Sequence, residues 1–114
     1  EEYIDWSMDA KSIHNIIRGL TPAPGAKSVL NVEGREPAVL RLEPGQPVEG
    51  AGDHAPGTLV GMDGDALLVA CGTGAYRLTR LRPAGKASMS AVDFYNGRLR
   101  QLSAPYGYLS GKQS

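Results

Sequence analysis

The sequence predicts a small, mainly β domain: a Greek-key barrel of five to six strands with an N-terminal helix and a short C-terminal helix. Its 114 residues suit a single domain. Its 15 glycines and 8 prolines fit many turns between short strands better than long helices. Short apolar segments recur between those turns, and closing them into a barrel hides the strand edges.

The first element is an amphipathic helix over residues 7–19. Ser7 or Asp9 can cap its start, because each offers a side-chain oxygen to free backbone N–H groups. Gly19 stands where a left-handed C-terminal residue belongs, and Trp6 is expected to pack on the same core. The apolar residues recur with the helical period and form one stripe: Ala10, Ile13, Ile16, Ile17 and Leu20.

A connector and a first hairpin follow this helix. Residues 21–25 contain two prolines, which fix φ and remove N–H donors, so we expect a rigid connector. Residues 27–32 and 36–42 have strand character and flank Glu33-Gly34, a suitable hairpin turn. The glycine- and proline-rich residues 43–57 are expected to form a long loop.

A second hairpin and a last strand complete the predicted barrel. Residues 58–62 and 66–70 flank Asp63-Gly64-Asp65, and Asp-Gly readily adopts the positive φ that a tight hairpin requires. In the last strand, residues 75–82, Leu78 and Leu81 are three positions apart. Both can point inward only if the strand bulges between them.

The C-terminal part is predicted to hold one short helix. Ser90 can cap a helix over residues 91–96, with Asp93 as the acidic partner of a capping box. Gly97 is expected to end it. Residues 98–114 have no sustained periodicity, so we expect a loosely held tail.

The sequence contains few groups that could perform chemistry. Cys71 is the one cysteine, which excludes an intrachain disulfide and predicts a small buried apolar residue. Asp53-His54 lies in the predicted loop and is expected to be a solvated surface pair, and His14 to be a satisfied or half-exposed helical histidine. Gly72-Thr73-Gly74 is interpreted as a hairpin turn. No metal-ligand spacing or phosphate loop is present, so we predict no catalytic, cofactor-binding or metal residue.

Charge is distributed unevenly along the chain, although 12 basic residues balance 12 acidic ones. Residues 1–65 carry five basic and eleven acidic side chains, whereas residues 66–114 carry seven basic and one acidic. Arg80, Arg82 and Lys86 cluster near the end of the last strand. This asymmetry indicates either a polyanion-binding side or cations that only keep a mixed surface soluble.

Features of membrane or exported proteins are missing from the sequence. No apolar run approaches the roughly 18–20 residues of a membrane span. Glu1 and Glu2 have the wrong charge for the start of a signal peptide, so a cytoplasmic location is expected. The chain does not begin with Met, which suggests an excised fragment.

Seven segments, taken in order, resemble the C-terminal domain of the formyltransferase family, on its methionyl-tRNA branch. They cover nearly all of residues 3–97 at sensible spacing. The middle ones are similar to the family's central strands, and the last two to its ending. The segments are residues 4–10, 13–20, 22–26, 55–60, 68–74, 83–86 and 89–97.

The resemblance implies an OB-like barrel that follows a Rossmann-like catalytic domain. Chemistry and the cofactor 10-formyltetrahydrofolate would belong to that preceding domain, so this chain alone is expected to be inactive and to hold no cofactor. Its partners would be the N-terminal catalytic domain and initiator methionyl-tRNA, in translation initiation. The single domain 1–114 would then divide as follows: linker and first helix 1–25, barrel strands 26–83, loop and short helix 84–97, tail 98–114.

The resemblance also implies which side chains meet tRNA. By position these are Arg18, Arg82 and Lys86, with Arg80 as a neighbour. Members often carry further basic residues directly after the lysine, whereas residues 87–88 are Ala-Ser here. Alternatives are the C-terminal domain of a sugar-nucleotide N-formyltransferase or of a formyltetrahydrofolate hydrolase-like enzyme, or a purely structural accessory domain.

Overall fold

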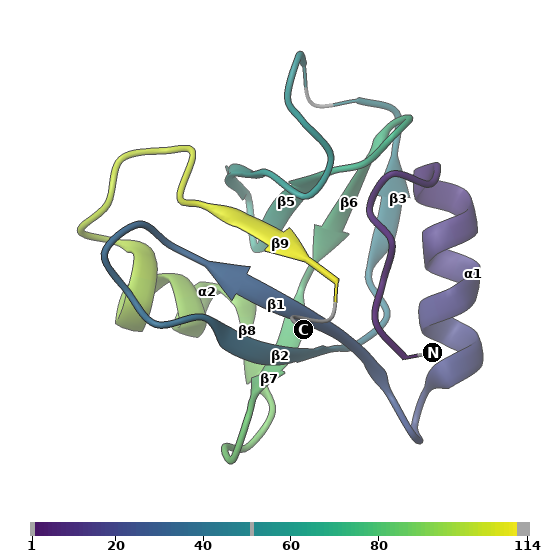
Figure 1. Cartoon of the computed structure of the whole chain (residues 1–114), viewed down its shortest axis with the longest axis horizontal. Helices are drawn as coiled ribbons and strands as arrows, with labels where there is room; N and C mark the ends of the chain where they lie inside the picture. Colours follow the sequence, from purple (N-terminus) through teal and green to yellow (C-terminus); the bar gives the residue numbers. More distant parts are fainter. Residues whose placement is uncertain (1, 51, 112–114) are drawn as a thin grey trace.

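Two antiparallel sheets and two helical segments make up the computed structural model, which describes residues 2–50 and 52–111 (Figure 1). One sheet has the strand order β8-β7-β2-β1-β9 and the other the order β3-β6-β5-β4. The mainly β class is thereby confirmed. The strand bounds are β1 Ala26–Asn31, β2 Ala38–Leu42, β3 Gln46–Val48, β4 Leu59–Asp63, β5 Ala66–Ala70, β6 Ala75–Leu78, β7 Arg80–Pro83, β8 Met89–Ser90 and β9 Tyr108–Ser110.

The two sheets are linked through the predicted last strand, which is broken at Thr79. Its first half, β6, belongs to the four-stranded sheet and its second half, β7, to the five-stranded sheet. Leu78 and Leu81 are both fully buried, as the expected irregularity between them requires. A bridge between Thr58 and Tyr108 joins the sheets at another point. In the described residues, strand pairing therefore gives two linked sheets where a single barrel was predicted.

Helix α1, Ala10–Leu20, begins at the Asp9 cap, three residues later than predicted. Asp9 Oδ2 accepts a hydrogen bond from the Ser12 backbone N–H at 3.1 Å, and Ser12 Oγ donates to Asp9 Oδ1 at 2.7 Å. Ser7, the other candidate, instead donates its hydroxyl to Asp5 Oδ1 at 2.6 Å. These hydrogen bonds hold the pKa values of both carboxyls below their usual range.

The end and the buried face of α1 differ in part from the prediction. Gly19 lies within the helix and does not adopt a positive φ. The helix ends instead where Thr21 Oγ1 donates to the Ile17 carbonyl at 2.8 Å. Ile17 is fully buried, but Ile16 is 36% exposed because it lies at the edge of the apolar stripe.

The short C-terminal helix α2, Ala91–Phe94, begins as predicted, because Ser90 Oγ accepts from the Asp93 backbone N–H at 3.0 Å. Gly97 does not end it. The chain continues as a π-helix, η1, over Tyr95–Leu99. Since the π-helical hydrogen bond joins residues five apart, Phe94 and Leu99 both reach the core and are fully buried.

Two three-residue strands lie where the sequence predicts none. Strand β3 lies inside the expected loop 43–57, and β9 inside the expected tail 98–114. Leu109 of β9 pairs with Leu30 of β1 and is 2% exposed, so the chain up to this strand is firmly held. Ala51 of the loop and residues 112–114 of the tail lie outside the described residues.

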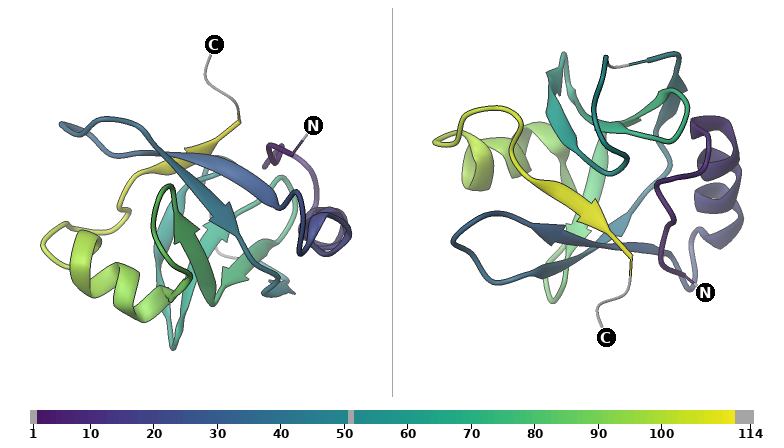
Figure 2. Two further views of the ribbon diagram at one scale, coloured as in Figure 1. Left: turned by 90° about the horizontal axis from the view of Figure 1, so that it is seen from below. Right: turned by 45° about the horizontal axis from the view of Figure 1, so that its top comes forward.

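Trp6 packs into the core, as expected, and ties distant segments together. Its Nε1 donates to Ser28 Oγ at 2.9 Å, and Ser28 Oγ donates to the Ser110 carbonyl at 2.7 Å. The segment before α1 is thereby attached to β1 and β9. In all three views α1 and α2 lie at opposite sides of the sheets (Figures 1 and 2), so the described fold has two distinct ends.

Candidate nucleic-acid interface

Three cations form a row across the outer face of the five-stranded sheet. Lys27 of β1 pairs in register with Arg41 of β2, and Arg41 pairs with Arg82 of β7. Residues directly opposite on antiparallel strands project to the same face of the sheet. Because Leu40 and Leu42 on either side of Arg41 are buried, this face is the outward one. We call Lys27, Arg41 and Arg82 the basic row.

Acidic side chains pair with Lys27, at one end of the basic row, and with Arg80, next to Arg82. Lys27 Nζ lies 3.4 Å from Glu2 Oε2. Arg80 lies two residues before Arg82 on the same face, with Nε 4.0 Å from Glu43 Oε1 and 3.3 Å from Ser88 Oγ. The side chains of both ion pairs are about one-third to one-half exposed, so each pair stabilises the fold little. They leave Arg41 and Arg82 as the cations of the row without an ion pair in the described chain.

Arg18 lies in the last turn of α1 and is exposed. Its charge acts on His14, one turn earlier, whose pKa is lowered by burial first and by Arg18 second. His14 Nδ1 lies 2.7 Å from the Tyr76 hydroxyl, which accepts from the Gly45 backbone N–H at 2.8 Å. His14 is thus the satisfied histidine that was expected. Glu43, the partner of Arg80, lines the same hollow as Thr21, the residue that follows α1.

Lys86 is held at the tip of the hairpin between β7 and β8. Its backbone N–H donates to the Pro83 carbonyl at 3.0 Å, and Gly85 supplies the φ of +77° that this turn requires. The side chain is exposed. Of the four predicted residues, Arg82 lines the hollow beside the end of α1, and Arg80 is paired with Glu43 of the same hollow. Arg18 lies in the last turn of α1, and Lys86 lies beyond the end of β7.

Arg41 and Lys27 were not predicted as site residues. The alternation of buried leucines around Arg41 in β2 was the available signal, because it marks residue 41 as outward-facing. Between the end of α1 and the row lies a hollow of about 220 Å³. Its lining consists of Thr21, Pro22, Gly25, Arg41, Leu42, Glu43 and Arg82.

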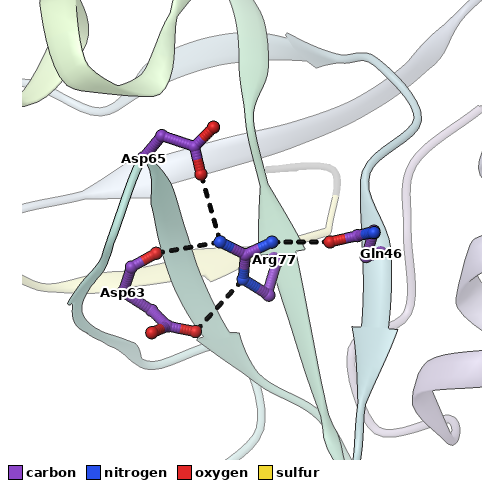
Figure 3. A network of polar contacts seen from close by, with 4 residues as sticks. All are labelled: Gln46, Asp63, Asp65 and Arg77. Atoms are coloured by element: carbon purple, nitrogen blue, oxygen red, sulfur yellow. Dashed lines mark hydrogen bonds and ion pairs between the residues drawn. The ribbon is translucent and has the colours of Figure 1, made fainter.

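Arg77, a cation of the basic half of the sequence, has a structural role instead (Figure 3). Nε donates to Asp63 Oδ2 at 3.1 Å, and Nη2 donates to the Asp63 carbonyl at 3.0 Å and to Asp65 Oδ1 at 3.1 Å. Nη1 donates to Gln46 Oε1 at 2.6 Å. Acids from the other half of the sequence thus neutralise Arg77, which ties β6 to β3 and to the β4–β5 turn.

The cations at the α2 end of the molecule also support packing. Arg35 Nη1 donates to the Arg98 carbonyl at 2.7 Å. The Arg98 guanidinium lies 5.6 Å from the centre of the Phe94 ring, within cation–π range. These two arginines therefore fasten the β1–β2 hairpin to the helical segment.

Groups suited to catalysis are sparse in the part of the chain that the structure describes. Cys71 is buried, as predicted, and burial followed by the charge of Asp9 raises its thiol pKa to about 12. Residues 2–50 and 52–111 contain no group of three or more His, Cys, Asp or Glu side chains placed to hold a metal ion. Neither do they contain a helix long and apolar enough to cross a membrane.

Comparison with known proteins identifies the family. The family model described as "Formyl transferase, C-terminal domain" matches residues 1–99. The chain belongs to the formyltransferase family, as a C-terminal domain. The basic row, the end of α1 and the β7–β8 hairpin all fall within the matched residues of this formyltransferase domain.

Relatives of this formyltransferase domain are named methionyl-tRNA formyltransferases. The protein from Methylobacterium sp. is 45% identical over 98 residues, 86% of this chain and 30% of its own length. The protein from Chlamydia muridarum is 38% identical over 90% of this chain and 33% of its own length. The protein from Brucella ovis is 42% identical over 86% of this chain and 30% of its own length. The chain thus spans about a third of the length of the curated relatives it matches.

Proposed function

We propose that this domain binds the tRNA substrate of a methionyl-tRNA formyltransferase that acts in translation initiation in the cytoplasm. The observation that carries the proposal is the pairing of exposed Arg82 with half-buried Arg41 beside the end of α1. Exposed Arg80 lies two residues before Arg82, and exposed Arg18 lies in the last turn of α1. The relatives are named methionyl-tRNA formyltransferases, which supports this substrate over a nucleotide sugar. Phosphate contacts from such side chains fix the register and orientation of a bound nucleic acid.

A neutral net charge is compatible with this role. Binding to a phosphate backbone depends on the cations close to it, since charges beyond about 10 Å are largely screened at 0.1 M salt. The acids that balance the total charge are partly engaged elsewhere, as Asp63 and Asp65 are by Arg77. The local surface around Arg18, Arg41 and Arg82 is therefore what a phosphate backbone meets.

The chemistry of formyl transfer is assigned to a preceding catalytic domain. That domain would bind 10-formyltetrahydrofolate and would contact initiator methionyl-tRNA together with this domain. We expect the 114-residue chain to form no formylmethionyl-tRNA from these two substrates. Formylmethionyl-tRNA above the level measured without enzyme would contradict the assignment of catalysis to the preceding domain.

The proposal is tested by titrating the chain with tRNA at 50 and 200 mM salt. We expect weak binding that falls steeply with salt, because each phosphate contact contributes roughly 0.7–0.9 units to the log–log slope. A variant carrying Arg80→Ala, Arg82→Ala and Lys86→Ala should bind more weakly at low salt with a shallower slope. Circular dichroism checks that its fold is intact.

Two outcomes would overturn the tRNA assignment. If the wild-type chain does not bind tRNA at low salt, the sugar-nucleotide branch, the hydrolase-like branch or a structural accessory role becomes the better account. If it binds with an affinity that salt does not change, phosphates are not what it recognises. Titration with a nucleotide sugar separates the first alternative from the other two.

A further inference from the structure

Arg41 and Arg82 lie side by side, and neither pairs with an acid of the described chain. They are directly paired across β2 and β7, where opposite Cβ atoms are about 4.5–5.5 Å apart. Like charges at such positions destabilise a sheet. Within residues 2–50 and 52–111 neither side chain makes an ion pair. An anion between them would remove this repulsion.

The Arg41 side chain is held in place by the connector after α1. Its Nη2 donates to the Pro22 carbonyl at 2.5 Å. The side chain lies directly over Gly25, where an added Cβ would be only 2.0 Å from Arg41 Nε. A guanidinium has five N–H donors, so this single hydrogen bond leaves others for a ligand. Arg41 is thus oriented before any ligand arrives, whereas exposed Arg82 is free to adjust.

The charged residues that line the hollow beside these arginines determine which anion fits there. Its lining includes both arginines and Thr21. Glu43 lies on the same hollow, with its carboxylate toward Arg80. The negative charge of Glu43 disfavours a second negative charge nearby, so a singly charged phosphodiester fits better than a doubly charged terminal phosphate.

We propose that Arg41 and Arg82 together clamp one phosphodiester of the RNA backbone, with Arg41 as the fixed donor and Arg82 as the mobile one. This inference rests on the proposed tRNA-binding function and adds Arg41 to the contact surface. Two arginines on one phosphate can donate several charge-assisted hydrogen bonds, which are the strong kind. The contact would anchor the backbone beside the end of α1.

The test is a double-mutant cycle on tRNA affinity, using Arg41→Gln, Arg82→Gln and the double variant. Each single variant should lose one phosphate contact. Its affinity deficit relative to wild type should then shrink about three-fold between 50 and 200 mM salt. The double variant should bind no more than slightly worse than the weaker single variant, because both arginines hold the same phosphate.

Matched controls separate a local defect from a general loss of charge. Arg100→Gln makes the same change at the exposed residue that directly follows η1, the continuation of α2, and should leave affinity nearly unchanged. Arg41→Lys keeps the charge but not the planar fork, and should retain the salt slope with reduced affinity. Circular dichroism spectra identify any variant that does not fold. If Arg41→Gln does not fold, the affinity and salt slope of Arg41→Lys are compared with those of the wild-type chain instead.

Three results would overturn the clamp, and they differ from failure of the proposed function. Wild-type affinity for Arg41→Gln would exclude Arg41 as a contact, even while the Arg80, Arg82 and Lys86 variant still loses binding. Additive losses in the double variant would place the two arginines on separate phosphates. A loss for Arg100→Gln equal to that for Arg41→Gln would indicate only a general charge effect. By contrast, absence of tRNA binding by the wild-type chain would reject the proposed function itself.

Discussion

Replacing Arg77 by Ala is expected to destabilise the fold without changing tRNA binding. The arginine side chain is only 19% exposed and joins three segments by four hydrogen bonds (Figure 3). Removing it leaves the Gln46 side chain and the Asp63 carbonyl without this donor and leaves two adjacent carboxylates unneutralised. The cation therefore acts on folding, not on recognition.

The size of the effect follows from the exposure of the partners. Asp63 and Asp65 are 58% and 76% exposed, so each ion pair contributes only about 0.2–1 kcal/mol. The hydrogen bonds to Gln46 and to the Asp63 carbonyl each contribute about 1 kcal/mol. Because members of one network are not additive, we expect a loss of about 2 kcal/mol in the free energy of unfolding. Arg82→Ala, which removes an exposed cation, should change it by less than about 0.5 kcal/mol.

Urea unfolding monitored by tryptophan fluorescence measures this difference. Trp6 is the one tryptophan and is 3% exposed, so its emission reports loss of the core. At an m-value of about 1–2 kcal/mol/M, the midpoint for Arg77→Ala should fall by roughly 1–2 M. Equal midpoints for Arg77→Ala and Arg82→Ala would refute the structural role of Arg77. So would a lower salt slope for tRNA binding by a folded Arg77→Ala variant.

Three further predictions concern single residues. Gly25→Ala should destabilise the fold by about 1–2 kcal/mol, because its φ is +91° and the new Cβ would displace Arg41; wild-type stability by urea titration would contradict this. The pKa of His14 lies below its usual 6.5 in the folded chain, so the unfolded chain binds a proton more readily and stability should fall as pH drops through 6.5. His14→Gln should flatten that slope in urea titrations from pH 7.5 to 5.5, and an unchanged slope would assign it to other groups. Cys71, with a pKa of about 12, should react with a thiol reagent at pH 8 at least about 100-fold more slowly when folded than in urea, and equal rates would show that it is accessible.

Local sequence signals predicted the hairpins and the helix N-caps well. The Glu33-Gly34 and Asp63-Gly64-Asp65 turns and the Ser90 cap involve residues at most a few positions apart, so the sequence alone contains the information. The break between Leu78 and Leu81 was likewise visible as a violation of strand alternation. Each of these features depends on neighbours along the chain.

Features that depend on distant pairing were missed. Strands β3 and β9 have three residues each, too few to display a period, and are stabilised by partners far along the chain, β6 and β1. The continuation of α2 as η1 past Gly97 follows from burial of Leu99, which overrides the tendency of glycine to end a helix. Tertiary contacts decide all three.

The same distinction applies to the candidate site. Arg80, Arg82 and Lys86 are close in sequence and were therefore predicted together, although Lys86 lies in the turn beyond the end of β7. Arg41 joins Arg82 only because β7 pairs with β2, and that strand order is not encoded by any local motif. Neutralisation of Arg77 likewise requires the packing of β3 and the β4–β5 turn around β6.

The most direct test of the central claim is to map tRNA binding onto the chain by amide chemical shifts in the ¹⁵N-labelled protein at low salt. We expect shifts concentrated in residues 18–25, 39–43 and 80–88, which form the end of α1 and the strands and turns around the basic row. Amides of α2 and η1, on the side of the molecule opposite α1 (Figure 2), should move little. Shifts confined to α2 and η1, or no shifts at all, would contradict the claim that this face of the domain holds tRNA.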